Sequence, residues 1–288
     1  VISGALVSLT ISYGMWIGWV PADGDSMSRG NHIYHGFIMS VGYMLALIMA
    51  RELQGARRYL CLALAVLIGL NVLVVEDGRT GYLQIITATS VFVGLTFSWK
   101  KTILASLIFA GCLAFTWWIS ETLQTELSNT YINLERAIDQ GDVRSSVGHR
   151  LEFYRSAVEI VSDSPVFGVG VGSVADALWS HYNEGKMKAY TDNVHGEFFN
   201  MLLAGGVFGV GLFLGFLIAI VYDGTRARKM GSTALGDSLI GLAFIVLVSA
   251  MFNSTIKDFG EKHVLIVVLS ACLAALPRMF LRGSRPAK

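Results

Sequence analysis

Residues 195–221 read HGEFFNMLLAGGVFGVGLFLGFLIAIV, and Glu197 is the single Asp, Glu, Lys or Arg among them. A helix needs roughly 20 predominantly apolar residues to cross a bilayer, so this run can span one and tilt within it. Comparable runs recur at approximately 1–20, 32–50, 59–75, 80–98, 102–119, 234–253 and 264–281. The sequence therefore predicts an all-α fold, a polytopic transmembrane helix bundle of about eight spans.

The composition supports a membrane protein and excludes several other classes. Charged residues make up 15% of the chain, against about 25% in soluble domains. The net charge of +1 provides no field that would attract nucleic acid. The three cysteines lie inside apolar runs, where burial raises the pKa of a thiol, so we expect neither disulfides nor a thiolate nucleophile.

The connections between spans alternate in charge, which predicts the orientation of the chain. One set of connections carries twelve lysines and arginines against three acids, and cytoplasmic loops are the ones enriched in Lys and Arg. We therefore place both termini in the cytoplasm of a bacterium, with the chain multi-pass in the inner membrane. The cytoplasmic cations are Arg51, Arg57, Arg58, Lys100, Lys101, Arg226, Arg228, Lys229, Arg278, Arg282, Arg285 and Lys288.

This topology divides the chain into three parts. Residues 1–119 are N-terminal transmembrane helices, 120–194 form one large periplasmic loop, and 195–288 are C-terminal transmembrane helices with a cytoplasmic tail. The loop holds six Lys and Arg against eleven Asp and Glu, a balance of −5. Any anion site in it must therefore use individual arginines. Long ordered loops of this kind are usually functional.

An amphipathic helix is predicted within the loop, over His149–Ser162. Its apolar residues recur at helical spacing and are Leu151, Tyr154, Val158 and Val161. Such a helix could lie at the membrane interface and cap a cavity. Pro165 ends it, and a glycine-rich turn follows that lacks the dinucleotide-binding spacing. Further on, Gly205 and Gly209 form a Gly-x-x-x-Gly pair, which is typical of close helix packing.

Two arginines at the predicted outer face could hold a phosphate group. Arg79 lies in a very short outer turn, and its planar guanidinium can bind phosphate oxygens in a bidentate manner. The alternative is an interfacial cation paired with Glu76 or Asp77. Arg150 opens the amphipathic helix, and the alternative there is an ordinary surface arginine. Lesser candidates of the same kind are Arg144 and Arg155.

His195 lies where the loop re-enters the membrane. Partial burial and nearby cations both disfavour a charged imidazole, and a neutral imidazole suits a general base. The alternative is a histidine that caps or packs at a helix start. Asn193 and Glu197 are near enough in sequence to orient it. His32 and His35 could share a metal ion, but no third ligand is evident nearby, so we expect an interfacial role and no metal site.

Three stretches resemble the O-antigen ligase and polymerase superfamily. The turn Gly78-Arg79-Thr80-Gly81 resembles its outer arginine turn, and residues 150–170 resemble its segment from an outer-loop arginine to a proline–glycine turn. Residues 193–209 resemble its histidine segment, although Gly196 stands where the family usually has asparagine. The three stretches occur in the family's order.

The resemblance implies a glycosyltransferase that uses a lipid carrier. Such an enzyme moves O-antigen polysaccharide from undecaprenyl pyrophosphate to a sugar hydroxyl of lipid A–core at the periplasmic face. It also implies that Arg79 and Arg150 bind the pyrophosphate and that His195 is the general base, with neither a metal nor another cofactor. The expected partners are the lipid-linked donor, the lipid A–core acceptor and membrane lipid.

Other functions remain open from the sequence. An O-antigen polymerase or a protein O-oligosaccharyltransferase of the same superfamily would differ only in the acceptor. A transporter or flippase for a lipid-linked glycan, or a non-catalytic scaffold, would also show many spans and outer arginines. Polar residues are nearly absent from the middles of the spans, which counts against an ion channel or a proton-coupled pump.

Overall fold

The computed structural model describes residues 2–16, 32–75 and 78–283, which form helices and turns with no strand among them. The chain divides into two compact units. The first, here the membrane unit, comprises Val1–Gln124, Ala219–Val248 and Phe259–Lys288. The second, here the loop unit, comprises Thr125–Ile218 and Ser249–Asp258. The all-α prediction is confirmed for the described residues.

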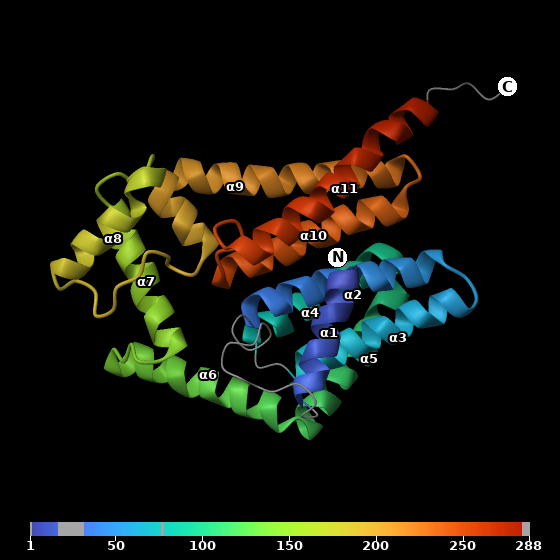
Figure 1. The fold of residues 1–288 in the computed structure, drawn as a ribbon, viewed down its shortest axis with the longest axis horizontal. Coiled ribbons are helices and arrows are strands. Elements are labelled where there is room, and N and C mark those ends of the chain that lie inside the picture. Colours follow the sequence, from blue (N-terminus) through green and yellow to red (C-terminus); the bar gives the residue numbers. More distant parts are fainter. Residues whose placement is uncertain (1, 17–31, 76–77, 284–288) are drawn as a thin grey trace. The chain divides into compact units, whose positions relative to one another are not determined.

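The membrane unit is a bundle of long helices in which α2 lies beside α1, α3 and α4 (Figure 1). α2 and α4 approach closely, since a Cβ atom on Gly36 would lie 3.2 Å from the Cα of Gly81. Small residues permit such contact between helices in a bilayer. The helices are α1 Ile2–Trp16, α2 His32–Glu52, α3 Ala56–Leu70 with the π-helical turn Asn71–Val75, α4 Arg79–Thr96, α5 Trp99–Ile119, α10 Thr233–Phe252 and α11 Phe259–Gly283.

Six helices of the described residues are long and apolar enough to cross a membrane. About eight spans were expected. Residues 80–98 do form helix α4, but it is not among the six, and the expected span 1–20 extends beyond the described part of α1. The six are Ile33–Glu52, Ala56–Val75, Trp99–Ile119, Glu197–Lys229, Thr233–Phe252 and Phe259–Leu276.

A buried ion cluster joins several helix ends in the membrane unit. Asp237, near the start of α10, is fully buried and binds both Arg51 at the end of α2 and Arg228 at the end of α9. Arg228 also donates to the carbonyl of Leu95 at 3.0 Å, and Arg51 donates to Thr96 at 3.2 Å, both in the last turn of α4. The sequence places Arg51, Arg228 and Asp237 on one side of the membrane, and the cluster agrees with that placement.

The loop unit is built from three helices and the first part of a fourth. They are α6 Glu121–Gln140, α7 Ser146–Val161, α8 Val174–Asn183 after the 3-10 turn Val171–Ser173, and α9 Glu197–Lys229. The helix predicted over 149–162 is confirmed as α7. Its start is fixed by Ser145, whose hydroxyl accepts from the backbone N–H of Gly148 at 3.0 Å. Neither α6 nor α8 was predicted.

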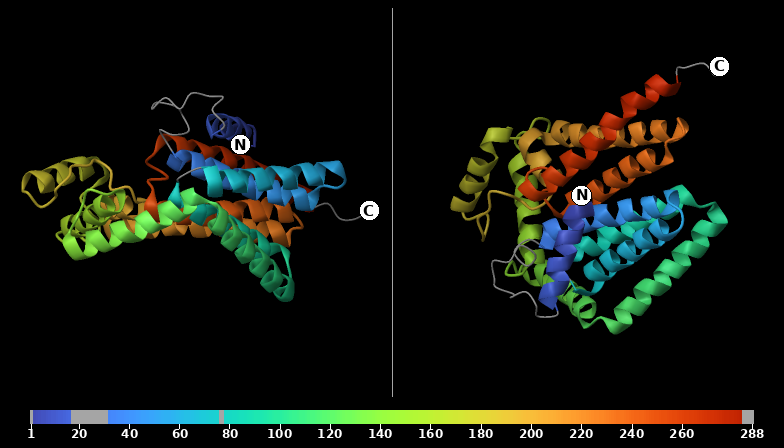
Figure 2. Two further views of the ribbon diagram at one scale, coloured as in Figure 1. Left: turned by 90° about the horizontal axis from the view of Figure 1, so that it is seen from below. Right: turned by 45° about the vertical axis from the view of Figure 1, so that its right-hand side comes forward.

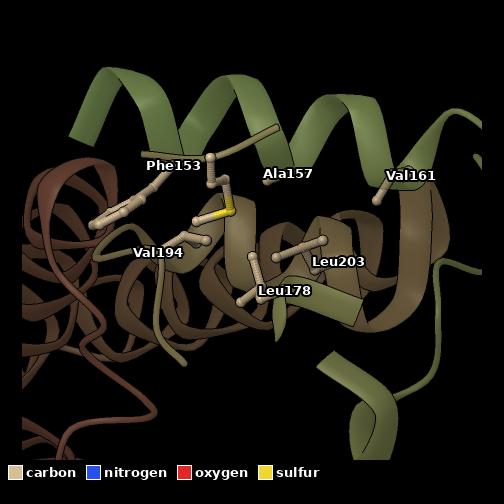
Figure 3. Close-up of a cluster of buried hydrophobic side chains, with 7 residues drawn as sticks. Phe153, Ala157, Val161, Leu178, Val194 and Leu203 are labelled. Carbon is tan, nitrogen blue, oxygen red and sulfur yellow. The ribbon is translucent and has the colours of Figure 1, made fainter. Parts of the chain in front are cut away.

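A small hydrophobic core holds the loop unit together (Figure 3). Residues of α7 face residues of α8, of the chain before α9 and of α9 itself. Because well-packed side chains leave little freedom to the elements that carry them, this core fixes α7 against the chain that leads to His195. Its members are Phe153, Ala157, Val161, Leu178, Met187, Val194 and Leu203.

Helix α9 is broken near its start, which is visible in Figure 1. Gly206 has a φ of 60° and is not helical. A Cβ atom there would lie 2.4 Å from the carbonyl carbon of Val166, so no other residue fits without movement. The backbone N–H of Val207, freed by the break, donates to the carbonyl of Pro165 at 2.9 Å. The turn after α7 therefore takes over the hydrogen bonding that the helix loses.

The glycine-rich turn after α7 also lies in close contact with the first part of α9. Gly168 has a φ of 64°, and a Cβ atom on it would lie 2.3 Å from the carbonyl oxygen of Leu203. The N–H of Val169 donates to that oxygen at 2.8 Å. Close packing of another helix at Gly205 and Gly209 was expected and is wrong for the described residues. A Cβ atom on Gly205 would have nothing within 4 Å, and a Cβ atom on Gly209 would lie 2.5 Å from the carbonyl oxygen of Met201, which belongs to α9 itself.

Candidate functional site

His195 occupies the turn that enters α9, in an unusual backbone conformation. Its φ is 53°, in the left-handed region that residues other than glycine seldom adopt. Two side chains hold it there. The backbone N–H of His195 donates to Oδ1 of Asn193 at 3.1 Å, and the hydroxyl of Tyr154 donates to the carbonyl of His195 at 3.0 Å. Strained residues of this kind concentrate at functional sites.

Asn193 is the centre of a buried polar network. Its Oδ1 accepts from the hydroxyl of Ser254 at 2.5 Å and from the amide of Asn200 at 3.1 Å, in addition to His195. The amide of Asn200 also donates to the Ser254 hydroxyl at 3.0 Å. Hydrogen bonds shared among buried side chains restrict the movement of the segments that carry them, although Oδ1 of Asn200 itself has no partner among the described residues. The turn before α9, α9 itself and the segment after α10 are therefore fixed to one another.

Glu197 ties the segment after α10 to the start of α9. Its carboxylate accepts from the backbone N–H of Ile256 at 2.9 Å and more weakly from that of Lys257 at 3.4 Å. Its own N–H donates to the carbonyl of Asn253 at 3.0 Å. The sequence named Asn193 and Glu197 as residues that could orient His195. Asn193 binds His195 directly, whereas Glu197 binds the neighbouring segment.

The surroundings of His195 favour a neutral imidazole. Burial lowers the pKa of the ring, and the positive charges of Arg150 and, more weakly, Lys257 lower it further, while Asp258 and Asp192 act in the opposite direction. The side chain is partly exposed, and neither ring nitrogen has a hydrogen-bond partner among the described residues of the loop unit. The ring can therefore receive a proton from a bound molecule.

Arg150 is the arginine of the loop unit whose charge reaches His195. It lies in the second turn of α7 and is partly buried. The other two candidates have different partners. Arg144 is exposed and forms a bidentate pair with Asp142 at 2.9 and 2.8 Å, which holds the pKa of that carboxyl well below its usual range. Arg155 is exposed and pairs with Glu159 at 2.8 Å.

Arg79 belongs to the membrane unit, where it is the first residue of α4 after Gly78, and it is partly buried. Arg150 and His195 thus lie in the loop unit, whereas Arg79 lies in the membrane unit. The alternative partners of Arg79 named from the sequence, Glu76 and Asp77, lie outside the described residues.

The second histidine of the His-x-x-His pair is bound within the membrane unit. One ring nitrogen of His35 lies 2.6 Å from the hydroxyl of Ser8, and the other lies 2.8 Å from Oδ1 of Asn71. Asn71 donates in turn to Ser12 at 2.8 Å. His35 is buried in this network, which differs from the interfacial role that we expected. Within the described ranges, no group of three His, Cys, Asp or Glu residues is placed to hold a metal ion.

Two contributors to the site were not predicted. Lys257 and Asp258 lie in the short segment after α10, and their charges act on His195. Asp258 also accepts from the Asn193 amide at 3.3 Å, and burial raises its pKa. Two adjacent charged residues between apolar runs were visible in the sequence, but their partner was not. Tyr154 is a third such contributor, because its place on the apolar face of the predicted helix gives no sign of the hydrogen bond that its hydroxyl donates to His195.

An apolar cavity of about 430 Å³ lies along α9 at its break. Its walls are almost entirely carbon, and Ile256 connects it to the segment that carries Lys257 and Asp258. The lining residues are Val171, Met201, Ala204, Gly205, Phe208, Gly209, Leu212, Phe213, Phe216 and Ile256. A cavity of this composition suits a hydrocarbon chain.

Comparison with protein families gives a match. A family model described as O-antigen ligase matches residues 26–214, which include Arg79, Arg150 and His195. Among curated proteins, no sequence matches the chain.

Proposed function

Because the chain belongs to the O-antigen ligase family, we propose that it moves an O-antigen glycan from undecaprenyl pyrophosphate to a sugar hydroxyl of lipid A–core. The reaction takes place at the periplasmic face of the bacterial inner membrane. One observation carries the proposal: the accessible imidazole of His195 is kept neutral by burial and by the charge of Arg150. A neutral base beside a fixed cation suits a reaction that releases a proton and an anion.

The proposed chemistry is a single displacement. The acceptor oxygen attacks the anomeric carbon of the glycan as its proton passes to a nitrogen of His195. The bond between the anomeric carbon and the pyrophosphate oxygen breaks, and its electron pair leaves with the pyrophosphate. A correctly placed general base contributes roughly 10²- to 10⁴-fold to such a step.

Arg150 has two roles in this proposal. Its guanidinium stabilises the charge that develops on the leaving pyrophosphate. Before the donor binds, it lowers the pKa of His195, which keeps the base unprotonated. A bound pyrophosphate offsets that positive charge, so the pKa of His195 rises when the ring must accept a proton. Arg79 is proposed as a second ligand of the pyrophosphate, on the basis of the family resemblance.

The lipid carrier is proposed to enter from the membrane. The apolar cavity along α9 is suited to the hydrocarbon tail, since α9 is long and apolar enough to span a bilayer. A tail held in the membrane confines the reacting end to the site, which lowers the entropic barrier.

Replacing the base tests the mechanism. We expect His195→Ala, reconstituted in lipid with a lipid-linked glycan donor and lipid A–core, to transfer roughly 10²- to 10⁴-fold more slowly while still binding the donor. His263→Ala is the matched control, because this exposed histidine lies at the start of α11. Transfer at the parent rate by His195→Ala would reject His195 as the base.

Supplying the acceptors one at a time tests the assignment as a ligase. The expected result is product with lipid A–core and none with a second lipid-linked glycan or with a serine- or threonine-containing peptide. Product with the lipid-linked glycan alone would identify a polymerase instead. Product with the peptide alone would identify a protein glycosyltransferase.

A further inference from the structure

Three aromatic side chains of the loop unit form a cluster that the proposed reaction does not use. Trp179 and Tyr182 come from α8, and Tyr190 lies between α8 and His195. The ring centroids of Trp179 and Tyr190 are 4.9 Å apart, with their planes at 88°, and Tyr182 lies 5.9 Å from each. These three residues are called the aromatic platform below.

The platform is exposed to solvent, although it also packs against the core of the loop unit. Trp179 is 49% exposed and Tyr190 is 43% exposed. Tyr182 packs against the core of the loop unit, and Leu178, next to Trp179 on α8, is fully buried in that core. The rings are therefore held in fixed positions, with a large aromatic area facing outward. Rigid aromatic surface of this kind is typical of binding sites.

The neighbours of the platform are polar, which favours a polar ligand over the hydrocarbon of a bilayer. Exposed residues of both charges, Glu184, Lys186 and Lys188, follow α8 in sequence. Figures 1 and 2 show α8 beyond the broken end of α9, on the side away from the apolar part of that helix. Exposed apolar side chains that suit lipid lie elsewhere in the unit, at Val171 and Phe208.

The chain connects the platform closely to His195. Tyr190 precedes His195 by five residues, which span at most about 18 Å when fully extended. Asn193, between them, is fixed by its buried network. The platform and the imidazole are thus held within a short, constant distance, comparable to the length of a few linked sugar rings.

We propose that the aromatic platform binds sugar rings of the glycan substrate, a few units away from the sugar that reacts. The faces of an aromatic ring carry partial negative charge. The C–H groups on one face of a pyranose ring are weakly positive, so the two faces stack, while the tyrosine hydroxyls hydrogen bond to sugar hydroxyls. This inference rests on the proposed function in one respect, namely that the substrate of the site is a glycan.

Donors of different length test the platform. We expect Trp179→Ala and Tyr190→Ala each to raise KM about 3- to 10-fold for a donor with many repeat units, and to leave KM unchanged for a donor with one sugar. The value of kcat stays constant for both donors. Trp179→Phe keeps most of the affinity, because an aromatic face remains. Tyr131→Ala, which removes an exposed ring from α6, is the matched control.

Fluorescence quenching tests the platform independently of transfer. The tryptophan signal that is lost in Trp179→Phe is expected to be shielded from acrylamide by the free oligosaccharide and to be unaffected by brominated lipids in the bilayer. Quenching by the lipids without shielding by the oligosaccharide would overturn the proposal and make the platform an interfacial anchor. Equal KM changes for long and short donors would also overturn it. If the parent protein transfers no glycan, the proposed function fails, and the shielding result still decides the platform.

Discussion

The pKa of His195 is set by burial and by charged residues on other segments of the chain. Burial and Arg150 both lower the pKa of the imidazole, so the base is unprotonated above that lowered pKa, and activity falls only at more acidic pH. We expect Arg150→Gln to raise the pKa towards its ordinary value. The acid limb of log(kcat/KM) against pH should then move to higher pH, in addition to any loss in rate.

Arg155→Gln is the control for that pH profile, since Arg155 is exposed and paired with Glu159. It should leave the acid limb where it is. An unchanged acid limb in Arg150→Gln would show that the charge of Arg150 does not act on the catalytic base.

Gly196 makes room for Tyr154. A Cβ atom at position 196 would lie 2.9 Å from Cε1 and 3.0 Å from the hydroxyl oxygen of Tyr154. The tyrosine ring also stacks on Phe199, with centroids 4.1 Å apart, so it has little freedom to move. We expect Gly196→Ala to destabilise the protein by about 1–3 kcal/mol in thermal unfolding, and Tyr154→Ala to remove most of that penalty in the double variant.

Gly172→Ala is a suitable comparison, because nothing lies within 4 Å of a Cβ atom there. Additive effects of the substitutions at 196 and 154 would contradict the coupling. The same contact would oppose any side chain larger than that of glycine at position 196, because it would need the space that the Tyr154 ring occupies.

Residue chemistry could be predicted from the sequence only where it was local. The partial burial of His195 and the proximity of Asn193 follow from positions close along the chain. Tyr154, Lys257 and Asp258 come from distant segments, and a single sequence does not show which segments meet. Their contributions to the site needed the structure.

The break in α9 depends on one of two adjacent glycines. Gly206 has a positive φ and touches the backbone of Val166, whereas Gly205 is helical and faces open space. We expect Gly206→Ala to cost more than about 2 kcal/mol and to expose the turn after α7 to proteolysis. Gly205→Ala should be neutral or stabilising by up to about 1 kcal/mol.

Thermal unfolding and limited proteolysis of the two variants provide the comparison. Equal behaviour of Gly205→Ala and Gly206→Ala would mean that the break does not require glycine at position 206.

Some features of the helices can be predicted from the sequence, and others cannot. α7 was predicted to within three residues at its start because its apolar spacing is regular. α6 carries a similar pattern, at Leu123, Leu127, Leu134 and Ile138, and could have been found the same way. The break in α9 could not, because a glycine within an apolar run is also compatible with a straight helix. What makes it break is a turn about 40 residues earlier in the chain.

The ion cluster around Asp237 joins α2, α4, α9 and α10 within the membrane unit. Removal of the Asp237 charge would leave Arg51 and Arg228 without their shared partner, and Arg51 would keep its ion pair with the more exposed Glu52. We expect Asp237→Asn to cost at the lower end of about 3–5 kcal/mol in detergent-solubilised protein, because both arginines keep some contact with solvent. Asp223→Asn, which changes a partly exposed acid on α9, should have little effect. A similar loss for both variants would contradict the role of the cluster.

The architecture as a whole was largely predictable from apolar runs and the distribution of charge. Those features depend on the bilayer, which imposes the same length and polarity on every span. The division into two units was not predictable, because it depends on the broken helix and on a turn that completes the loop unit from the C-terminal part of the chain. Sequence patterns therefore indicate some residues of the proposed site, whereas the others can be identified only in the folded structure.

A single carbonyl oxygen, Oδ1 of Asn193, receives hydrogen bonds from the His195 backbone, from Asn200 and from Ser254. Conversion of that amide to an acid, which is a common form of chemical ageing in proteins, would keep this acceptor but replace the nitrogen that donates to Asp258 by a second carboxylate oxygen. We therefore expect ageing at Asn193 to set two carboxylates against each other and to loosen the segment after α10 from the turn that carries His195.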